Sequence, residues 1–149
     1  MEIIIALPVM VIITLALFEF GLLMVVDQTV VSAATKGARE AGKGANVMEV
    51  ADVVNEFLAV HSIAITSTSA TGNIVLEVGG QPTTSLNGNP CTPPATPVLG
   101  LDEARVTVCV ELTYPPIAGE TPPVPDALAT FGFTLDGRSL KTSTLVKKE

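Results

Sequence analysis

The chain has 149 residues, which is room for one ordinary domain. Its 8 basic and 15 acidic residues give a formal net charge of −7, and this argues against nucleic-acid binding, which needs a basic face to neutralise phosphates. The apolar residues make up 48% of the chain but concentrate near its start, so the average composition describes neither half.

An apolar run extends from Ile3 to Val26. As a helix these residues would measure about 36 Å, enough to cross a hydrocarbon layer of about 30 Å. We expect a transmembrane-type helix rather than a cleaved secretory signal, whose apolar region covers about 7 to 15 residues and follows a basic stretch. Pro8 removes one helical hydrogen bond and predicts a local bend or melted turn near the helix start.

Glu19 is a carboxylate inside this apolar run. It lies about 24 Å along the helix from Ile3, still within the hydrocarbon layer. An ionised side chain there costs several kcal/mol unless it is paired, hydrated or neutralised. The position favours a role in setting the register of helices packed in an assembly. The alternatives are a residue that snorkels to the interface and a residue of proton or ion chemistry.

Helical character continues after the apolar run. Ala33, Gly37 and Ala41 recur at every fourth position, a pattern of small residues that lets another helix approach closely. The alternative is an Ala-rich stretch that only favours a helix. The basic residues of this segment form either a solvated surface or a lipid or partner contact; they are Lys36, Arg39 and Lys43.

Glycines at positions 42 and 44 predict the end of the first helix. We therefore divide the chain into an N-terminal helix of residues 1–45 and an extracytoplasmic head of residues 46–149. Asn46 and Glu49 form a variant of the capping box at the start of a second, amphipathic helix that ends near Val60.

From Ser62 the apolar period changes to that of strands. We expect strands over residues 62–69, 73–80, 105–114 and 135–148, with a tight turn at Asp136-Gly137 in the last segment. In the third strand one face is apolar and is the best candidate for the sheet core; it comprises Val106, Val108, Val110 and Leu112.

Ten of the eleven prolines lie between Pro82 and Pro125 and define long loops. The predicted fold class is α+β: a long N-terminal transmembrane or filament-core helix, a second amphipathic helix, and a small antiparallel β-sheet head with long Pro-rich loops.

Cys91 and Cys109 are the only cysteines, and both lie in the predicted extracytoplasmic head. We expect them to form a disulfide that stabilises the fold by roughly 3 kcal/mol; the alternative is a pair of buried thiols. A metal site is disfavoured because His61 is the only histidine. The sequence lacks HExxH, P-loop and GxGxxG motifs, so we predict no catalytic residue and no cofactor.

The N-terminal segment resembles the signature of the TadE-like family, the pseudopilins of tight-adherence pili. The matching elements are Glu2, Leu7-Pro8, Glu19-Phe20-Gly21, Gln28 and "AATKGAREA", in that order. The C-terminal "GRSLKTSTLVKKE" is similar to family endings. The family's basic residues and Gly ahead of the Glu2 position are absent, as expected for a processed subunit, and Thr35-Lys36 stands where the family tends to have Arg-Glu.

This resemblance implies a pilin-like structural subunit that waits in the inner membrane as a single-pass protein, with its head outside the cytoplasm. It then joins copies of itself in an extracellular filament, together with other pilus subunits and assembly machinery. The resemblance also implies that Glu2 pairs with the terminal amine of a neighbour; a simple interfacial charge is the alternative. A membrane-anchored minor pseudopilin or accessory protein is the alternative function. We predict that Pro8, Phe20 and Gly21 share in assembly with Glu2, Glu19 and the small residues.

Overall fold

The computed structural model describes residues 2–69, 72–112 and 124–149. Two helices, α1 (Glu2–Gly42) and α2 (Val47–Leu58), precede a sheet of β1 (Gly72–Val78), β2 (Thr84–Ser85), β3 (Glu103–Glu111) and β4 (Ser139–Lys147). Two short 3-10 helices, η1 (Ala59–His61) and η2 (Ala127–Phe131), lie between these elements. The α+β class predicted from the sequence is confirmed.

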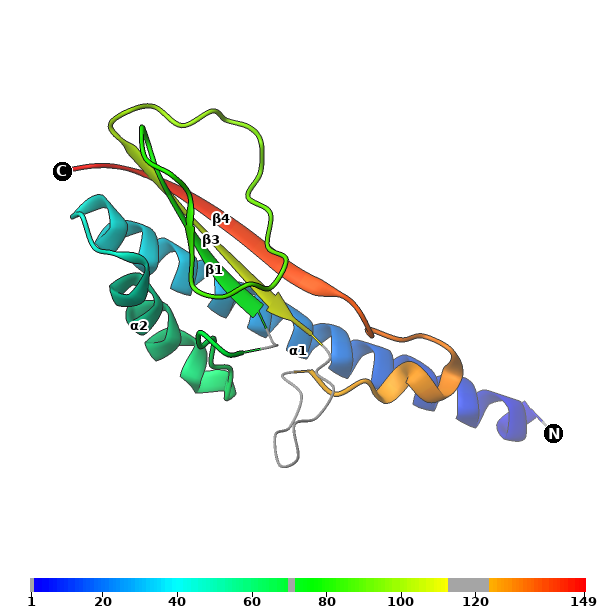
Figure 1. The fold of residues 1–149 in the computed structure, drawn as a ribbon. Coiled ribbons are helices and arrows are strands. Elements are labelled where there is room, and N and C mark those ends of the chain that lie inside the picture. Colours follow the sequence, from blue (N-terminus) through cyan, green and yellow to red (C-terminus); the bar gives the residue numbers. More distant parts are fainter. Residues whose placement is uncertain (1, 70–71, 113–123) are drawn as a thin grey trace.

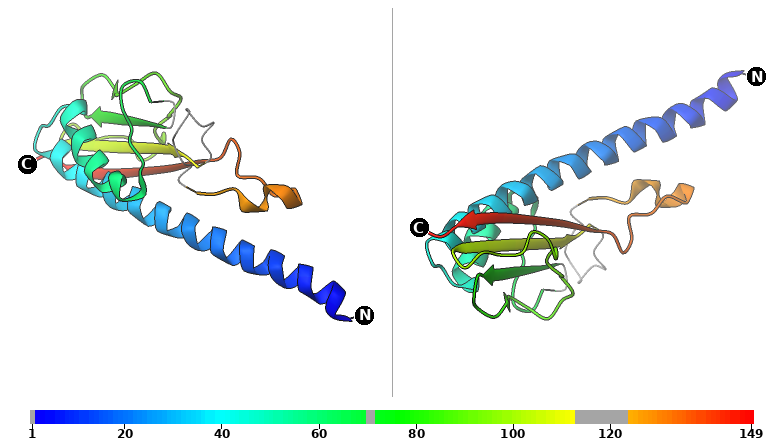
Figure 2. Two further views of the ribbon diagram at one scale, coloured as in Figure 1. Left: turned by 90° about the horizontal axis from the view of Figure 1, so that it is seen from below. Right: turned by 90° about the horizontal axis from the view of Figure 1, so that it is seen from above.

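The strands are antiparallel in the order β2-β1-β3-β4. In the register of the two long pairings, Val108 of β3 lies opposite Ile74 of β1 and Thr142 of β4. Both helices lie on one face of this sheet, and the N-terminal half of α1 projects beyond it (Figures 1 and 2). The C-terminal half of α1 is therefore part of the packed head.

The turn between the helices follows from its sequence. Gly44 adopts a positive φ of 93°, which a residue without Cβ tolerates, and the amide of Ala45 donates to the Glu40 carbonyl. Asn46 then caps α2 through the amides of Met48 and Glu49, and the Glu49 side chain accepts from the Asn46 amide. The predicted helix break and capping box are both confirmed.

The core lies between the two helices and the sheet. It takes valines and alanines from α1, the apolar face of α2, and the four predicted core residues, of which three lie in β3 and Leu112 directly follows it. The largest fully buried side chains on the helices and the following segment are Val26, Val30, Val50, Val54, Leu58 and Ile65. The division of the chain at residue 45 stays a prediction, although this core includes residues from both sides of it.

The predicted strand over residues 62–69 is wrong. Ile63 and Ile65 are buried as a strand pattern requires, but Asn55 of α2 bonds the backbone of Ile65 on both sides: its amide nitrogen donates to the carbonyl and its oxygen accepts from the amide, each at 2.8 Å. The Asn55 side chain thus makes the two backbone hydrogen bonds of Ile65 that a neighbouring strand would otherwise make. The short β2, in contrast, was missed by the sequence prediction.

Of the two outcomes predicted at Pro8, the melted turn is wrong, because α1 continues through this residue; the local bend stays a prediction. Pro8 removes a single helical bond close to the start of a 41-residue helix. The turn at Asp136-Gly137 is confirmed: the amide of Arg138 donates to the Leu135 carbonyl, and Gly137 has a φ of 69°. It leads into β4, which begins at Ser139, four residues later than the predicted start of the strand.

Candidate assembly surface

The N-terminal half of α1 presents large apolar side chains to its surroundings. Leu17 is 70% exposed and Phe18 is 61% exposed. The other exposed members are Leu7, Val9, Met10, Val11, Ile13, Phe20, Met24 and Val25. The most apolar 18-residue window of the helix has a mean hydropathy of 2.6, and only 11% of it is buried. Length and composition thus allow a membrane anchor or a signal segment.

The C-terminal half of α1 is instead held by the rest of the chain. Ala33, Gly37 and Ala41 all face the head and are buried. A Cβ built on Gly37 would lie 2.7 Å from Cγ2 of Val54 in α2, so α2 approaches α1 as closely as a missing side chain allows. Gly37 therefore brings α1 against α2 of the same chain. A role for these three residues between subunits stays a prediction.

Glu19 lies on the inner stripe of α1 that also carries Val26 and Val30. It is only 6% exposed, and its Oε2 accepts a hydrogen bond of 3.1 Å from the amide of Leu128 in η2. The two residues are 109 positions apart in the sequence, and η2 lies beside the projecting half of α1 (Figures 1 and 2). Glu19 thus contacts its own chain.

An apolar hollow of about 610 Å³ surrounds this contact. Glu19 and Leu23 of α1 form one side. The other side includes Leu128, Phe133, Leu135 and one cationic residue, Arg138. A smaller hollow of about 290 Å³ continues along the helix past Ala16 and Phe20. Carboxylate and amide therefore meet in mostly apolar surroundings, where each would be costly to leave without a partner.

The remaining predicted assembly residues are spread along α1. Phe20 is exposed on its flank, and a Cβ added at Gly21 would find no atom within 4 Å. Pro8 is exposed, and Glu2 begins the helix. The structure does not bring these residues together with Ala33, Gly37 or Ala41. Their role in assembly stays a prediction.

The sheet face that points away from the helices is covered by the Pro-rich loop between β2 and β3. The predicted disulfide is formed: Cys91 in this loop is bonded to Cys109 in β3. Thr107 of β3 is also buried, and its hydroxyl bonds that of Ser143 in β4 at 2.7 Å. This explains why β3 is buried on both faces although only one of them is fully apolar.

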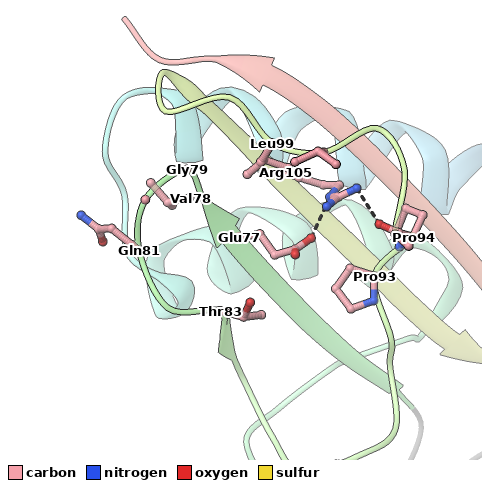
Figure 3. Close-up of a pocket in the computed structure, with 12 residues that line it drawn as sticks. Glu77, Val78, Gly79, Gln81, Thr83, Pro93, Pro94, Leu99 and Arg105 are labelled. Carbon is pink, nitrogen blue, oxygen red and sulfur yellow. Dashed lines mark hydrogen bonds and ion pairs between the residues drawn. The ribbon is translucent and has the colours of Figure 1, made fainter.

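Arg105 holds the same loop a few residues after Cys91 (Figure 3). Its Nε donates to Glu77 of β1 at 2.7 Å, and its Nη1 donates to the carbonyls of Pro94 at 2.7 Å and Pro97 at 3.2 Å. Arg105 is buried, so these bonds satisfy a charge that would otherwise be costly. Asn73 similarly donates to the carbonyls of Asn87 and Asn89. The sequence prediction missed these contacts, because neither spacing nor motif marks them.

Two exposed ion pairs, Lys43 with Glu40 and Lys147 with Asp102, lie near the C-terminal end of α1. The side-chain hydrogen bond to Glu40 and its charge raise the pKa of Lys43 above its ordinary 10.5. A backbone hydrogen bond, together with Lys147, lowers the pKa of Asp102 below its ordinary 3.8. Across the described residues, no group of three or more His, Cys, Asp and Glu side chains is placed to hold a metal ion.

Residues 1–39 match the family model described as TadE-like protein. This match covers α1 almost to its end and confirms the resemblance found in the N-terminal sequence. The TadE-like family is a structural, pilus-associated family, and the match suggests a pilus-associated, pseudopilin-like protein. No curated protein and no solved structure matches the chain.

Proposed function

We propose that this protein is a pilin-like structural subunit that assembles into an extracellular filament through the N-terminal half of α1. Before assembly, this half anchors the chain in the inner membrane as a single span, with the head outside the cytoplasm. The observation that carries the proposal is the exposed apolar half of α1, which projects from an otherwise packed head. The N-terminal family match supports the same conclusion.

A long helix with large apolar side chains around most of its circumference is not stable in water. In the membrane, lipid covers these side chains. When the subunit leaves the membrane, other apolar helices must replace the lipid, and copies of the same half helix supply such a surface. Copies of itself are therefore the partners we propose, with other pilus subunits and the assembly machinery acting during export.

The proposal is tested by shearing fibres from cells that produce the protein and identifying their subunits by mass spectrometry. We expect this chain to be a main component of the fibres. Its absence from fibres together with its presence in membranes would contradict a filament subunit and favour a minor pseudopilin or accessory protein.

A matched pair of variants tests which surface assembles. Leu17→Glu places a charge on the exposed half of α1, whereas Leu101→Glu makes the same change at an exposed position in the turn before β3. We expect Leu17→Glu to remove the protein from sheared fibres and Leu101→Glu to leave its amount unchanged. Equal incorporation of both variants would contradict assembly through α1.

A further inference from the structure

We propose that residues 127–135, which include η2, form a second membrane contact and dip into the lipid beside α1. The segment carries no charged residue and is bracketed by Asp126 and Asp136. We call residues 127–135 the apolar loop. The inference rests on the proposed function, in that α1 spans the membrane before assembly.

The first argument is the level at which the loop meets α1. Asp27 is the first charged residue after the apolar run, so it marks where α1 leaves the lipid. Glu19 lies eight positions before Asp27, or about 12 Å deeper along the helix. Because Glu19 accepts from the Leu128 amide, the backbone of the loop reaches about the same depth.

The second argument is the chemistry of that contact. In hydrocarbon, an unpaired backbone amide costs several kcal/mol, and so does a lone carboxylate. The bond between Leu128 and Glu19 gives each group a partner at that depth. The loop supplies the donor of this bond, and the helix supplies the acceptor.

The third argument is the outer surface of the loop. Phe133 is 68% exposed and Phe131 is 46% exposed. The segment that carries them, coloured orange, extends from the sheet toward the same end of the molecule as the N-terminal half of α1 (Figure 2). At the neck of the loop, Asp126 accepts from the Thr134 hydroxyl at 2.7 Å and from the Leu135 amide at 3.3 Å. The loop is thus closed on itself by its own polar groups, with the phenylalanines left for lipid.

The chain contains no tryptophan, so a single introduced tryptophan reports its own surroundings. Three variants of the full chain are compared: Phe133→Trp in the loop, Phe18→Trp in the exposed half of α1, and Val98→Trp in the Pro-rich loop, where Val98 is 83% exposed. Each is reconstituted in vesicles of phosphatidylethanolamine and phosphatidylglycerol, with or without brominated acyl chains that quench tryptophan on contact.

We expect brominated lipid to reduce the emission of Phe133→Trp nearly as much as that of Phe18→Trp, and to leave Val98→Trp unchanged. Quenching of Phe18→Trp alone overturns the lipid contact while the α1 anchor stands. In that case blue-shifted emission from Phe133→Trp indicates cover by a second copy, and water-like emission indicates a solvated loop. If Phe18→Trp is not quenched either, the membrane anchor fails and the inference fails with it.

Two further results keep the experiment decisive. Quenching of Val98→Trp to the same extent would mean that the whole head lies in lipid, and this overturns a contact specific to the loop. If Phe133→Trp does not fold, Phe131→Trp places the probe two residues away on the same loop, and the same expectations apply.

Discussion

The two halves of α1 form one continuous helix, yet they are used in opposite ways. Residues 6–25 carry large side chains and are mostly exposed, whereas residues 26–42 carry valine, alanine and glycine on the face that is buried against α2 and the sheet. The halves differ in composition and in side-chain size: residues 26–42 carry charged residues on their exposed face, whereas Glu19 is the only charged residue of residues 6–25. Small residues let the head pack closely on the helix, and large ones leave a wide apolar surface for a partner outside the chain.

The largest expected effect comes from adding the same side chain to each half. Gly37→Leu places its Cβ 2.7 Å from Val54 and 3.2 Å from Val50. We expect it to prevent folding of the head or to lower the free energy of unfolding by more than about 3 kcal/mol. Thermal unfolding of the full chain in detergent, followed by circular dichroism, measures this.

Gly21→Leu is the matched control, because an added Cβ there meets no atom within 4 Å. It removes a helical glycine, which favours the helix by about 0.8 kcal/mol, so the head should melt at the wild-type temperature or above it. Equal destabilisation by both variants would show that the two halves do not differ in their packing.

The next largest effect concerns the stability of the head alone. Breaking the disulfide between Cys91 and Cys109, which are 18 residues apart, should lower the stability of the head by roughly 3 kcal/mol and its melting temperature by roughly 10 to 20 °C. Melting with and without reducing agent measures the change, and a Cys91→Ser, Cys109→Ser double variant that ignores the reductant is the control. Unchanged melting after verified reduction would contradict the stabilising role of this bond.

A smaller effect is expected where the exposed half meets its own head. Glu19→Ala removes the acceptor for the Leu128 amide and leaves this amide without that partner, which costs about 1 to 3 kcal/mol locally. Hydrogen exchange of peptides covering η2 should accelerate, while peptides from β1 and β3 keep their protection. Glu19→Gln retains an oxygen that can accept this hydrogen bond, so the η2 peptides should exchange more slowly in Glu19→Gln than in Glu19→Ala. Equal protection of η2 in the wild type and in both variants would contradict a stabilising role for this hydrogen bond.

The smallest effect is a pH dependence at the far end of α1. Because Glu40 raises the pKa of Lys43, the pair adds stability that is fully present below pH 10.5 and is lost as the pH rises through the raised pKa. Both side chains are substantially exposed, so the effect on melting should be slight. NMR titration of Lys43 should show a lower midpoint in Glu40→Gln than in the wild type; identical midpoints would refute the pairing.

Local sequence signals predicted the helices, the capping box, the disulfide and the core face of β3, because each depends on neighbouring residues or on a scarce residue type. Contacts made through side chains across long distances were not predictable. The Asn55 side chain bonds the backbone of Ile65 in place of a strand. Arg105 donates to two proline carbonyls, and the Leu128 amide donates to Glu19, which is 109 positions away. Each depends on which segments the fold brings together, and no local pattern records this.

Ala33, Gly37 and Ala41 show the same limit. Their spacing predicts a closely packed helix, but it does not identify that helix. At Gly37 the helix that packs closely is α2 of the same chain.

The measurement that tests the account most directly is a helical reconstruction of sheared fibres by electron cryomicroscopy. The account predicts that residues 6–25 of neighbouring copies pack together along the fibre axis, while residues 26–42 of each copy stay against their own α2 and sheet. Fibres in which the heads form the axis and residues 6–25 lie apart, or in which residues 26–42 leave their own head, would contradict it.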